Sequence, residues 1–384
     1  MGAGASRQAS VRRSTFEELG AEITVPAPAT GNVTNGMTAS HPSSSAPTPG
    51  ITCRICGNTQ NNRPFPAKEM MFGSREEFPY IECGTCGTVQ IAEIPPDLGK
   101  YYPSDRYFSL AHGASANRGP AHRLIEGLQF RTIVPSSLGH AGAWYRLLSY
   151  LDMTEPGVEA VGRIGVRRDA RLLEVGCGNG RLLRMLGRLG FAHLRGVDPF
   201  LPGDVWESGV SLQKLDVGEL DRSAFFDVII LYHSLEHVPD PVATLRSVTA
   251  HLARDGVAIV AMPIVNTAFR LYGVHWYQLD PPRHLHLFSV KGFEIALARS
   301  GLRLAGSYFN STAAQFRISE AYARDVALVE IPPARFSFGR ARLPEFVTRR
   351  EARYRSRAHA LNASREGDQG VFYLRRSAET LSAG

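Results

Sequence analysis

Short apolar runs alternate with helical periods from residue 170 to the end of the chain. This alternation predicts a parallel β-sheet whose strands are joined by crossover helices. Five strands are expected first, at residues 171–175, 194–197, 211–215, 226–232 and 257–262. Two more strands are expected to close the sheet, at residues 302–308 and 370–374. The pattern therefore places this part of the chain in the α/β class.

One helix is expected between the strands at 226–232 and 257–262. Asp240 is suited to cap its first turn, and Pro241 stands at the first helical position. Thr249 joins its apolar face through a methyl group, and Gly256 follows its expected end. The apolar positions that share this face are Val242, Leu245, Val248 and Leu252.

The composition is that of a folded chain. With 384 residues, 43% of them hydrophobic and 21% charged, it has room for one catalytic-sized domain and a smaller appendage, and a collagen-like or coiled-coil rod is excluded. Asp227 and Pro263 interrupt the longest apolar stretches, which fall short of the ~20 residues of a membrane span. The first residues lack the pattern of a secretory signal, so we expect a cytoplasmic location without structural disulfides.

Four of the five cysteines form two Cys-x-x-Cys pairs, each followed by a glycine. Two thiolates on one tight turn can bind a metal together, and two such turns complete a tetrahedral site for structural Zn²⁺. A thioredoxin-like redox pair is disfavoured because two pairs occur, and free buried thiols are disfavoured by the paired spacing. The expected ligands are Cys53, Cys56, Cys83 and Cys86.

A glycine-rich turn at residues 176–180 follows the first expected strand and precedes a helix that starts near Arg181. Glycines allow the backbone to turn sharply and to approach a ligand at the helix N-terminus. The second strand ends in Asp198, a carboxylate suited to the two hydroxyls of a ribose. The Gly-x-Gly-x-Gly spacing differs from the Gly-x-Gly-x-x-Gly of dinucleotide binders.

The run from Leu172 to Gly180 resembles the first motif of class I S-adenosylmethionine-dependent methyltransferases, and the resemblance covers roughly residues 145–310. It implies a Rossmann-like, doubly wound methyltransferase sheet of seven strands. It also implies that Asp198 holds the ribose of the cofactor and that Asp216 lies by the adenine. The residues that it assigns to the methionine end are Glu174, Gly176, Gly178 and Gly180. An ordinary pair of strand-end carboxylates is the disfavoured alternative, because open α/β sheets bind ligands at these strand ends.

Residues 226–241 resemble the Leu-Glu-His-Val signature of small-molecule methyltransferases related to ubiquinone-pathway and sugar enzymes. A base is useful there because an acceptor becomes nucleophilic as it loses its proton. We expect His237 to be the base, with His233 and Glu236 orienting it or the substrate, and Tyr232 facing the substrate. The alternative is a structural role for His237 at the end of the fourth strand.

Residues 276–289 resemble the Pro-x-His-x-x-x-Phe-Ser segment of the same relatives. His284 and His286 would share one face of an extended segment and form a substrate wall. The alternative is a metal half-site, and metal-free chemistry is preferred. The run 101–108 after the cysteines resembles sugar carbon-methyltransferases, whose zinc domain contributes a tyrosine to the active site, and Tyr107 is the candidate here.

The first 50 residues lack any apolar period, which favours disorder. The arginines between 335 and 357 favour a solvated helical face over a surface for acidic ligands. The chain is expected to contain a disordered arm at 1–50, a zinc-ribbon domain at 51–108, a helical connector or lid at 109–169, an S-adenosylmethionine-binding methyltransferase domain at 170–310, a mostly helical arginine-rich insertion at 311–369, and a closing strand and tail at 370–384.

These patterns predict a methyltransferase that uses S-adenosylmethionine and carries a structural zinc ion. The expected acceptor is oxygen or carbon of a small molecule, such as a sugar, a glycan-pathway intermediate or a secondary metabolite. The first alternative is an RNA base methyltransferase, which the net charge of +7 permits without requiring. The second is a non-catalytic zinc-binding interaction protein, which the intact glycine turn argues against. The oligomeric state is left open.

Overall fold

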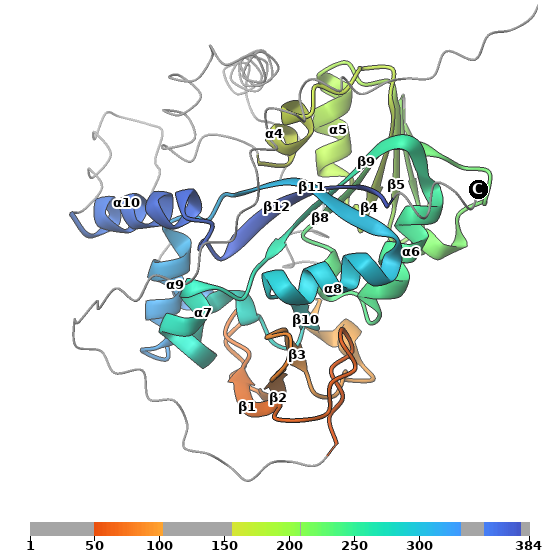
Figure 1. Ribbon diagram of the computed structural model, residues 1–384. Coiled ribbons are helices and arrows are strands. Elements are labelled where there is room, and N and C mark those ends of the chain that lie inside the picture. Colours follow the sequence, from red (N-terminus) through yellow and green to blue (C-terminus); the bar gives the residue numbers. More distant parts are fainter. Residues whose placement is uncertain (1–49, 103–155, 208, 332–348, 378–384) are drawn as a thin grey trace, which may run out of the picture.

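The computed structural model describes residues 50–102, 156–207, 209–331 and 349–377 (Figure 1). Several sequence predictions lie outside the described residues. These are nearly all of the disordered arm, Tyr107, most of the connector at 109–169 and three of the eight clustered arginines. Within the described residues, no helix is both long and apolar enough to cross a membrane.

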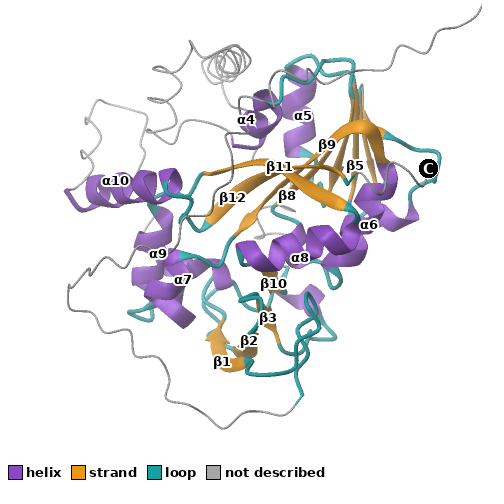
Figure 2. Cartoon of the chain, in the orientation of Figure 1, coloured by secondary structure: helices purple, strands orange, loops and turns teal. Residues whose placement is uncertain are grey.

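An eight-stranded sheet forms the larger part of the molecule (Figure 2). Its order is β11-β12-β9-β8-β4-β5-β7-β6, and the five strands from β9 to β7 run parallel. The antiparallel strands β12 and β11 close one edge. The bounds are β4 Arg171–Val175, β5 His193–Val197, β6 Val205–Glu207, β7 Val210–Gln213, β8 Phe226–Tyr232, β9 Leu252–Pro263, β11 Leu302–Phe309 and β12 Gln369–Arg376.

The α/β class and the seven predicted strands are confirmed. The main differences are one added strand, an earlier end of β7, and a start of β9 at Leu252 instead of residue 257. The short edge strand β6 was not predicted, because three residues give no readable period. Strand β7 ends at Gln213, before the predicted residue 215. The reason is a loop contact from outside the strand, since the backbone N–H of Lys214 donates to Asp204 Oδ1 at 2.8 Å.

Helices cover both faces of this sheet. Successive residues of a strand point to opposite faces, so Leu172 packs with α4 and α5 whereas Leu173 packs with α6 and α8. Both faces are therefore buried, as expected for a doubly wound sheet. The helices are α4 Pro156–Arg163, α5 Arg181–Arg188, α6 Pro241–His251, α7 Thr267–Tyr272, α8 Val290–Ser300, α9 Ala314–Tyr322 and α10 Arg349–Ala363.

Helix α6 begins as predicted and ends earlier than predicted. Asp240 Oδ1 accepts a hydrogen bond from the backbone N–H of Ala243 at 2.9 Å, which caps the first turn. Leu252 already belongs to β9, where it pairs with Phe226. Gly256 therefore lies inside that strand, within the irregular stretch between the paired residues Leu252 and Val257. The apolar pattern does not distinguish the last helical turn from the first strand residue.

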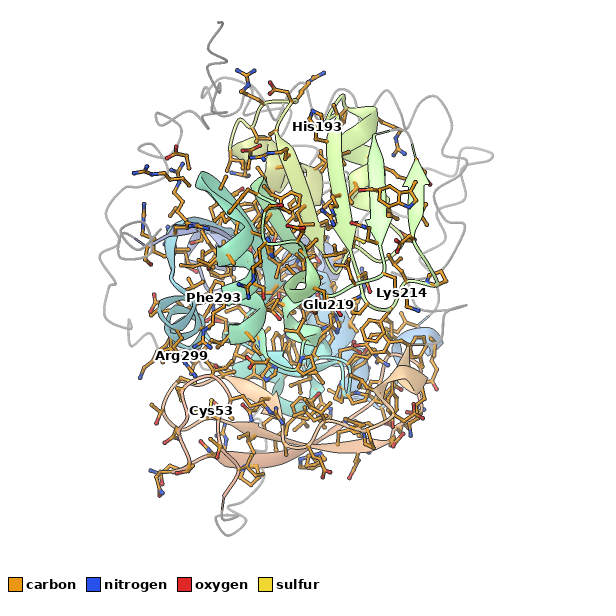
Figure 3. All side chains as sticks on the ribbon, turned by 90° about the vertical axis from the view of Figure 1, so that its right-hand side faces the viewer. Cys53, His193, Lys214, Glu219, Phe293 and Arg299 are labelled. Atoms are coloured by element: carbon orange, nitrogen blue, oxygen red, sulfur yellow. The ribbon has the colours of Figure 1, made fainter. Side chains whose placement is uncertain are left out.

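A second sheet of four strands is built mainly from residues 50–102, called the front part below, which contains four of the five cysteines. Its order is β1-β2-β3-β10, so its last strand comes from the chain that follows β9. Arg299 of α8 donates a hydrogen bond to the carbonyl of Ile55, and Figure 3 shows Arg299 and Cys53 on adjoining parts of the molecule. The bounds are β1 Arg63–Lys68, β2 Glu77–Glu82, β3 Val89–Ile91 and β10 His286–Leu287.

Candidate active site and metal centre

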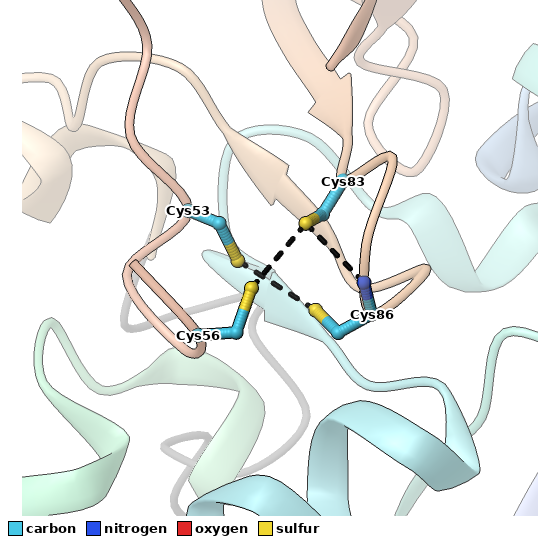
Figure 4. Close-up of side chains that lie close together, drawn as sticks. All are labelled: Cys53, Cys56, Cys83 and Cys86. Carbon is cyan, nitrogen blue, oxygen red and sulfur yellow. Dashed lines mark hydrogen bonds between the residues drawn. The ribbon is translucent and has the colours of Figure 1, made fainter. Parts of the chain in front are cut away.

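The four predicted metal ligands converge at one point of the front part (Figure 4). The Sγ atoms are 3.7 Å apart for Cys53 and Cys86, and 3.5 Å apart for Cys56 and Cys83. A tetrahedron with Zn–S bonds of about 2.3 Å has edges of roughly 3.8 Å. The donor set and its spacing therefore fit a structural Zn²⁺ ion with four thiolate ligands.

Both cysteine turns have the same backbone geometry. The N–H of Gly57 donates to Cys53 O, and the N–H of Gly87 donates to Cys83 O. The two glycines have φ values of 78° and 72°, a region that other residues rarely adopt. These glycines therefore allow the chain to present two sulfur atoms from each turn.

The glycine turn joins β4 to α5 and leaves no room for side chains. A Cβ atom on Gly176 would lie 2.5 Å from Ser234 Cβ, and one on Gly180 would lie 2.7 Å from a methyl group of Leu212. Gly176, Gly178 and Gly180 all have positive φ values, of 73°, 49° and 71°. The glycines thus allow a tight backbone turn that packs against Ser234 and Leu212 just before the N-terminal end of α5.

Two buried carboxylates lie beside this turn. Asp198 accepts a hydrogen bond from the N–H of Gly178 through Oδ2 and from the N–H of Phe200 through Oδ1, both at 2.9 Å. Glu174 is 5% exposed, and within the described residues its Oε2 has no hydrogen-bond partner. Burial, followed by the charge of Asp198, raises the pKa of Glu174 to about 8. A buried oxygen without a partner is suited to a cationic ligand.

Asp216 lies farther along the same sheet edge, after β7. It is exposed, and its Oδ1 accepts a hydrogen bond from the N–H of Gly218 at 2.8 Å. This bond caps the short 3-10 helix Val217–Glu219. The structure therefore brings Glu174, the three glycines and Asp198 together, and it gives Asp216 a local capping contact.

The end of β8 carries a chain of polar contacts. The side-chain amide of Gln369 donates to His233 Nε2 at 2.9 Å. Because Nε2 accepts this hydrogen bond, the proton of the ring is on Nδ1, which donates to Glu236 Oε1 at 3.1 Å. Glu236 is 1% exposed. Burial opposes its ionisation, but the hydrogen bond from His233 and the nearby imidazoles outweigh burial and lower the pKa of Glu236 to about 2. Tyr232 is half-buried, with its ring against that of His233.

His237 is held by a backbone carbonyl. Its Nδ1 lies 3.0 Å from Arg283 O and 3.1 Å from the hydroxyl of Tyr102. A carbonyl only accepts, so Nδ1 carries the proton and Nε2 keeps a lone pair. Burial, followed by the neighbouring His284, lowers the pKa of His237 to about 4. At neutral pH this imidazole is therefore uncharged.

The two other predicted histidines separate. The His284 ring lies 4.7 Å from that of His237, and its Nδ1 donates to Gln278 O at 2.7 Å. His286 instead donates to Val238 O at 3.1 Å, and burial with the charge of Arg54 lowers its pKa to about 3. One ligand atom from each of Glu236, His237 and His284 lies within 4.8 Å of the others, so this cluster has the donors for a cation as well as for proton transfer.

Sequence reasoning missed Tyr102, Gln369 and Arg283. Tyr102 stands in the aromatic run from which Tyr107 was chosen, so the run was the available signal. Its ring also stacks on Phe200, with centroids 6.1 Å apart. Arg283 lies between Pro282 and His284 in the segment that resembles Pro-x-His-x-x-x-Phe-Ser, so that segment was the available signal. Gln369 lies in no motif that points to the site.

Comparisons with known proteins identify relatives of the part of the chain that carries the glycine turn and the histidines. A family model described as a methyltransferase domain matches residues 155–305. The ubiquinone biosynthesis O-methyltransferase of Xylella fastidiosa (strain M23) is 32% identical over 154 residues, covering 35% of this chain and 61% of the relative. That of Maricaulis maris (strain MCS10) is 30% identical over 190 residues, covering 43% of this chain and 72% of the relative.

One solved structure that the comparison matches is the 1,6-didemethyltoxoflavin-N1-methyltransferase of Burkholderia thailandensis, with bound 1,6-didemethyltoxoflavin and S-adenosylhomocysteine. It is 16% identical with a TM-score of 0.36, covering 68% of this chain and 93% of that chain. The present chain spans only about three fifths of the Xylella relative's length. The identity and coverage of the Maricaulis relative nevertheless show that the chain belongs to the class I S-adenosylmethionine-dependent methyltransferases.

Proposed function

We propose that this protein transfers a methyl group from S-adenosylmethionine to oxygen or carbon of a small molecule. The proposed acceptor classes are sugars, glycan-pathway intermediates and secondary metabolites. The single observation that supports acceptor activation most strongly is geometric: Arg283 O fixes the proton of His237 on Nδ1, and the buried Glu236 lies close to the same ring. Both follow β8, the neighbour of β4 in the sheet, and β4 leads into the glycine turn. The names of the curated relatives favour oxygen as the methylated atom.

The cofactor would be bound by the residues around the glycine turn. S-Adenosylmethionine supplies an electrophilic methyl group on a cationic sulfonium. Glu174 provides an unpartnered buried oxygen for its positively charged end, and Asp198 is suited to the ribose hydroxyls. Asp216 is proposed to lie by the adenine. The loop glycines permit close approach of the backbone.

His237 is the proposed general base. Its Nδ1 is bound to Arg283 O, so Nε2 is the atom that accepts a proton from the acceptor. Glu236 stabilises the resulting imidazolium by its negative charge, and His233 holds Glu236 in place. Tyr232, His284 and His286 are proposed to form the substrate wall, and Tyr107 to contribute from the front part.

Turnover with a panel of acceptors tests this function. Phenols, sugars and a structured RNA are incubated with S-adenosylmethionine, and release of S-adenosylhomocysteine is measured. His237→Ala should lower turnover by ~10² to 10⁴ with nearly unchanged cofactor affinity, which is the effect of losing a positioned base. His251→Ala is the matched control, because that buried ring also hydrogen-bonds a backbone carbonyl, Ala224 O at 2.9 Å, and lies outside the proposed site.

Three results would count against the proposal. Methylation of the RNA alone would favour the nucleic-acid alternative. Full turnover by His237→Ala, with loss in His233→Ala, would move the base to His233. Cofactor binding without methylation of any acceptor would refute the assigned activity.

A further inference from the structure

Arg283 has a charged side chain that is completely buried between the two parts of the molecule. It is 0% exposed. Its guanidinium donates to Asp280 through Nε at 2.9 Å and through Nη2 at 2.6 Å, and Nη2 also donates to Glu69 Oε1 at 2.8 Å. Glu69 follows β1 in the front part, so this network crosses from the cysteine-bearing part to the segment after β9.

Glu69 is fixed by its own surroundings. It is 1% exposed, and its two oxygens accept hydrogen bonds from the backbone N–H groups of Phe72 and Ser74 and from the Ser74 hydroxyl, at 2.8, 3.0 and 3.1 Å. Arg283 Nη1 adds a bond to Tyr101 O at 3.3 Å. The front part therefore holds the guanidinium with a rigid carboxylate and a backbone carbonyl.

The backbone of the same arginine contacts the proposed base. Arg283 O accepts from His237 Nδ1 at 3.0 Å and from the Tyr102 hydroxyl at 3.3 Å. A buried guanidinium fixed by several hydrogen bonds restricts the position of its own carbonyl. That carbonyl selects the His237 tautomer that leaves Nε2 free for a proton.

The network also has a net negative charge close to the histidines. Arg283 contributes one positive charge, and Asp280 and Glu69 contribute one negative charge each. Asp280 Oδ2 lies 4.0 Å from His284 Nε2, and the His284 ring contacts His237. The remaining negative charge favours the imidazolium that forms when His237 accepts a proton.

We propose that Glu69 and Arg283 are positioning residues for His237, through which the metal-binding front part holds the base in its active tautomer. This inference rests on the proposed function. It assigns the front part a role in acceptor activation in addition to binding the metal.

Glu69→Gln tests the inference, because it keeps the size of the side chain and removes its charge. With ¹⁵N-labelled histidine at neutral pH, long-range ¹H–¹⁵N spectra report which His237 nitrogen carries the proton, and His237→Gln identifies the signal. We expect a mixture of tautomers in Glu69→Gln in place of the single Nδ1–H form. Turnover should fall ~10- to 100-fold, with unchanged cofactor affinity.

Arg75→Gln is the matched control across the same interface. The Arg75 side chain donates to Asp325 and Glu330 at 3.1 and 2.9 Å in an exposed setting, and its other side-chain hydrogen bond goes to Gly73 O, so it does not bond to Arg283 or to a histidine. This variant should keep the parent tautomer and turnover. Zinc content and circular dichroism confirm that each compared variant is folded.

A folded Glu69→Gln protein with the parent tautomer and turnover would overturn the inference. If Glu69→Gln loses zinc, Arg283→Lys is measured in the same way. Lysine keeps the positive charge but cannot make the bidentate hydrogen bond to Asp280. Failure of both variants to fold would make the network purely structural and would also overturn the inference. Absence of turnover in the parent protein would refute the proposed function, while the tautomer comparison would still decide the positioning role.

Discussion

Cofactor affinity should depend on pH through Glu174. This carboxyl is buried, and its pKa is raised to about 8, first by burial and then by Asp198. In the free protein at neutral pH it therefore holds a proton. A cationic cofactor favours the ionised form, so binding should release that proton, and affinity should rise as the pH approaches 8.

The expected size of this effect follows from the pKa. A carboxyl with a pKa of about 8 is ionised in roughly one molecule in eleven at pH 7. Below that pKa, affinity should change ~10-fold per pH unit, which gives ~50-fold between pH 6 and pH 8, or ~2.3 kcal/mol. The range ends at pH 8, because a free α-amino group such as that of the cofactor loses its own proton near there.

Titration calorimetry measures both the affinity and the proton. At pH 7, runs in two buffers with different ionisation enthalpies should show release of ~0.9 proton per cofactor bound. Glu174→Gln should bind more weakly, with no proton release and a flat affinity between pH 6 and pH 7. Asp216→Asn is the control, since that exposed residue should leave the slope unchanged. The same pH dependence in Glu174→Gln as in the parent would refute this reasoning.

Three further outcomes test the remaining sites. Asp198→Ala should weaken cofactor binding by ~1 to 3 kcal/mol, because hydrogen bonds to the charged carboxylate are lost. Nicotinamide dinucleotides should not bind to the parent protein. An unchanged affinity of Asp198→Ala in calorimetry would contradict the assignment of Asp198. Cys83→Ser should lose about one equivalent of zinc, measured by atomic emission, together with the folded front part; full thermal stability without metal would contradict the coupling. A chelator that leaves the zinc bound should not reduce turnover. If the chelator does reduce turnover and added Mg²⁺ or Mn²⁺ restores it, a catalytic cation would instead be placed at Glu236, His237 and His284.

Local patterns predicted most of the sheet. The apolar run 226–232 is buried on both faces in β8, so its length could be read directly from the sequence. The end of β7 could not be read, because the Asp204 side chain that binds the N–H of Lys214 comes from a separate loop. Similarly, the change from α6 to β9 at Leu252 depends on pairing with Phe226 of another strand.

The cofactor residues were easier to place together than the histidines. Glu174 pairs with Gly196 in adjacent parallel strands, so two strand-end carboxylates necessarily lie at one sheet edge. The expected alternation of His284 and His286 needs an extended chain. The N–H groups of Arg283 and His284 both bond to Asp280 O, which forms a turn, so His284 does not lie in an extended segment with His286. No local pattern encodes that turn.

The metal-binding part and the acceptor site are linked by the backbone as well as by Arg283. Leu285 donates its N–H to Glu236 O at 2.8 Å, and its carbonyl accepts from the N–H of Ile91 in β3 at 3.1 Å. The next residue, His286, begins β10 and pairs with Gln90. Strand β3 in turn follows the second cysteine turn closely, so its position depends on the geometry of the four sulfur atoms. One short segment thus connects the metal ligands to the backbone of Glu236. Loss of the structural metal should therefore disturb the position of Glu236, although Glu236 is not a ligand of that ion.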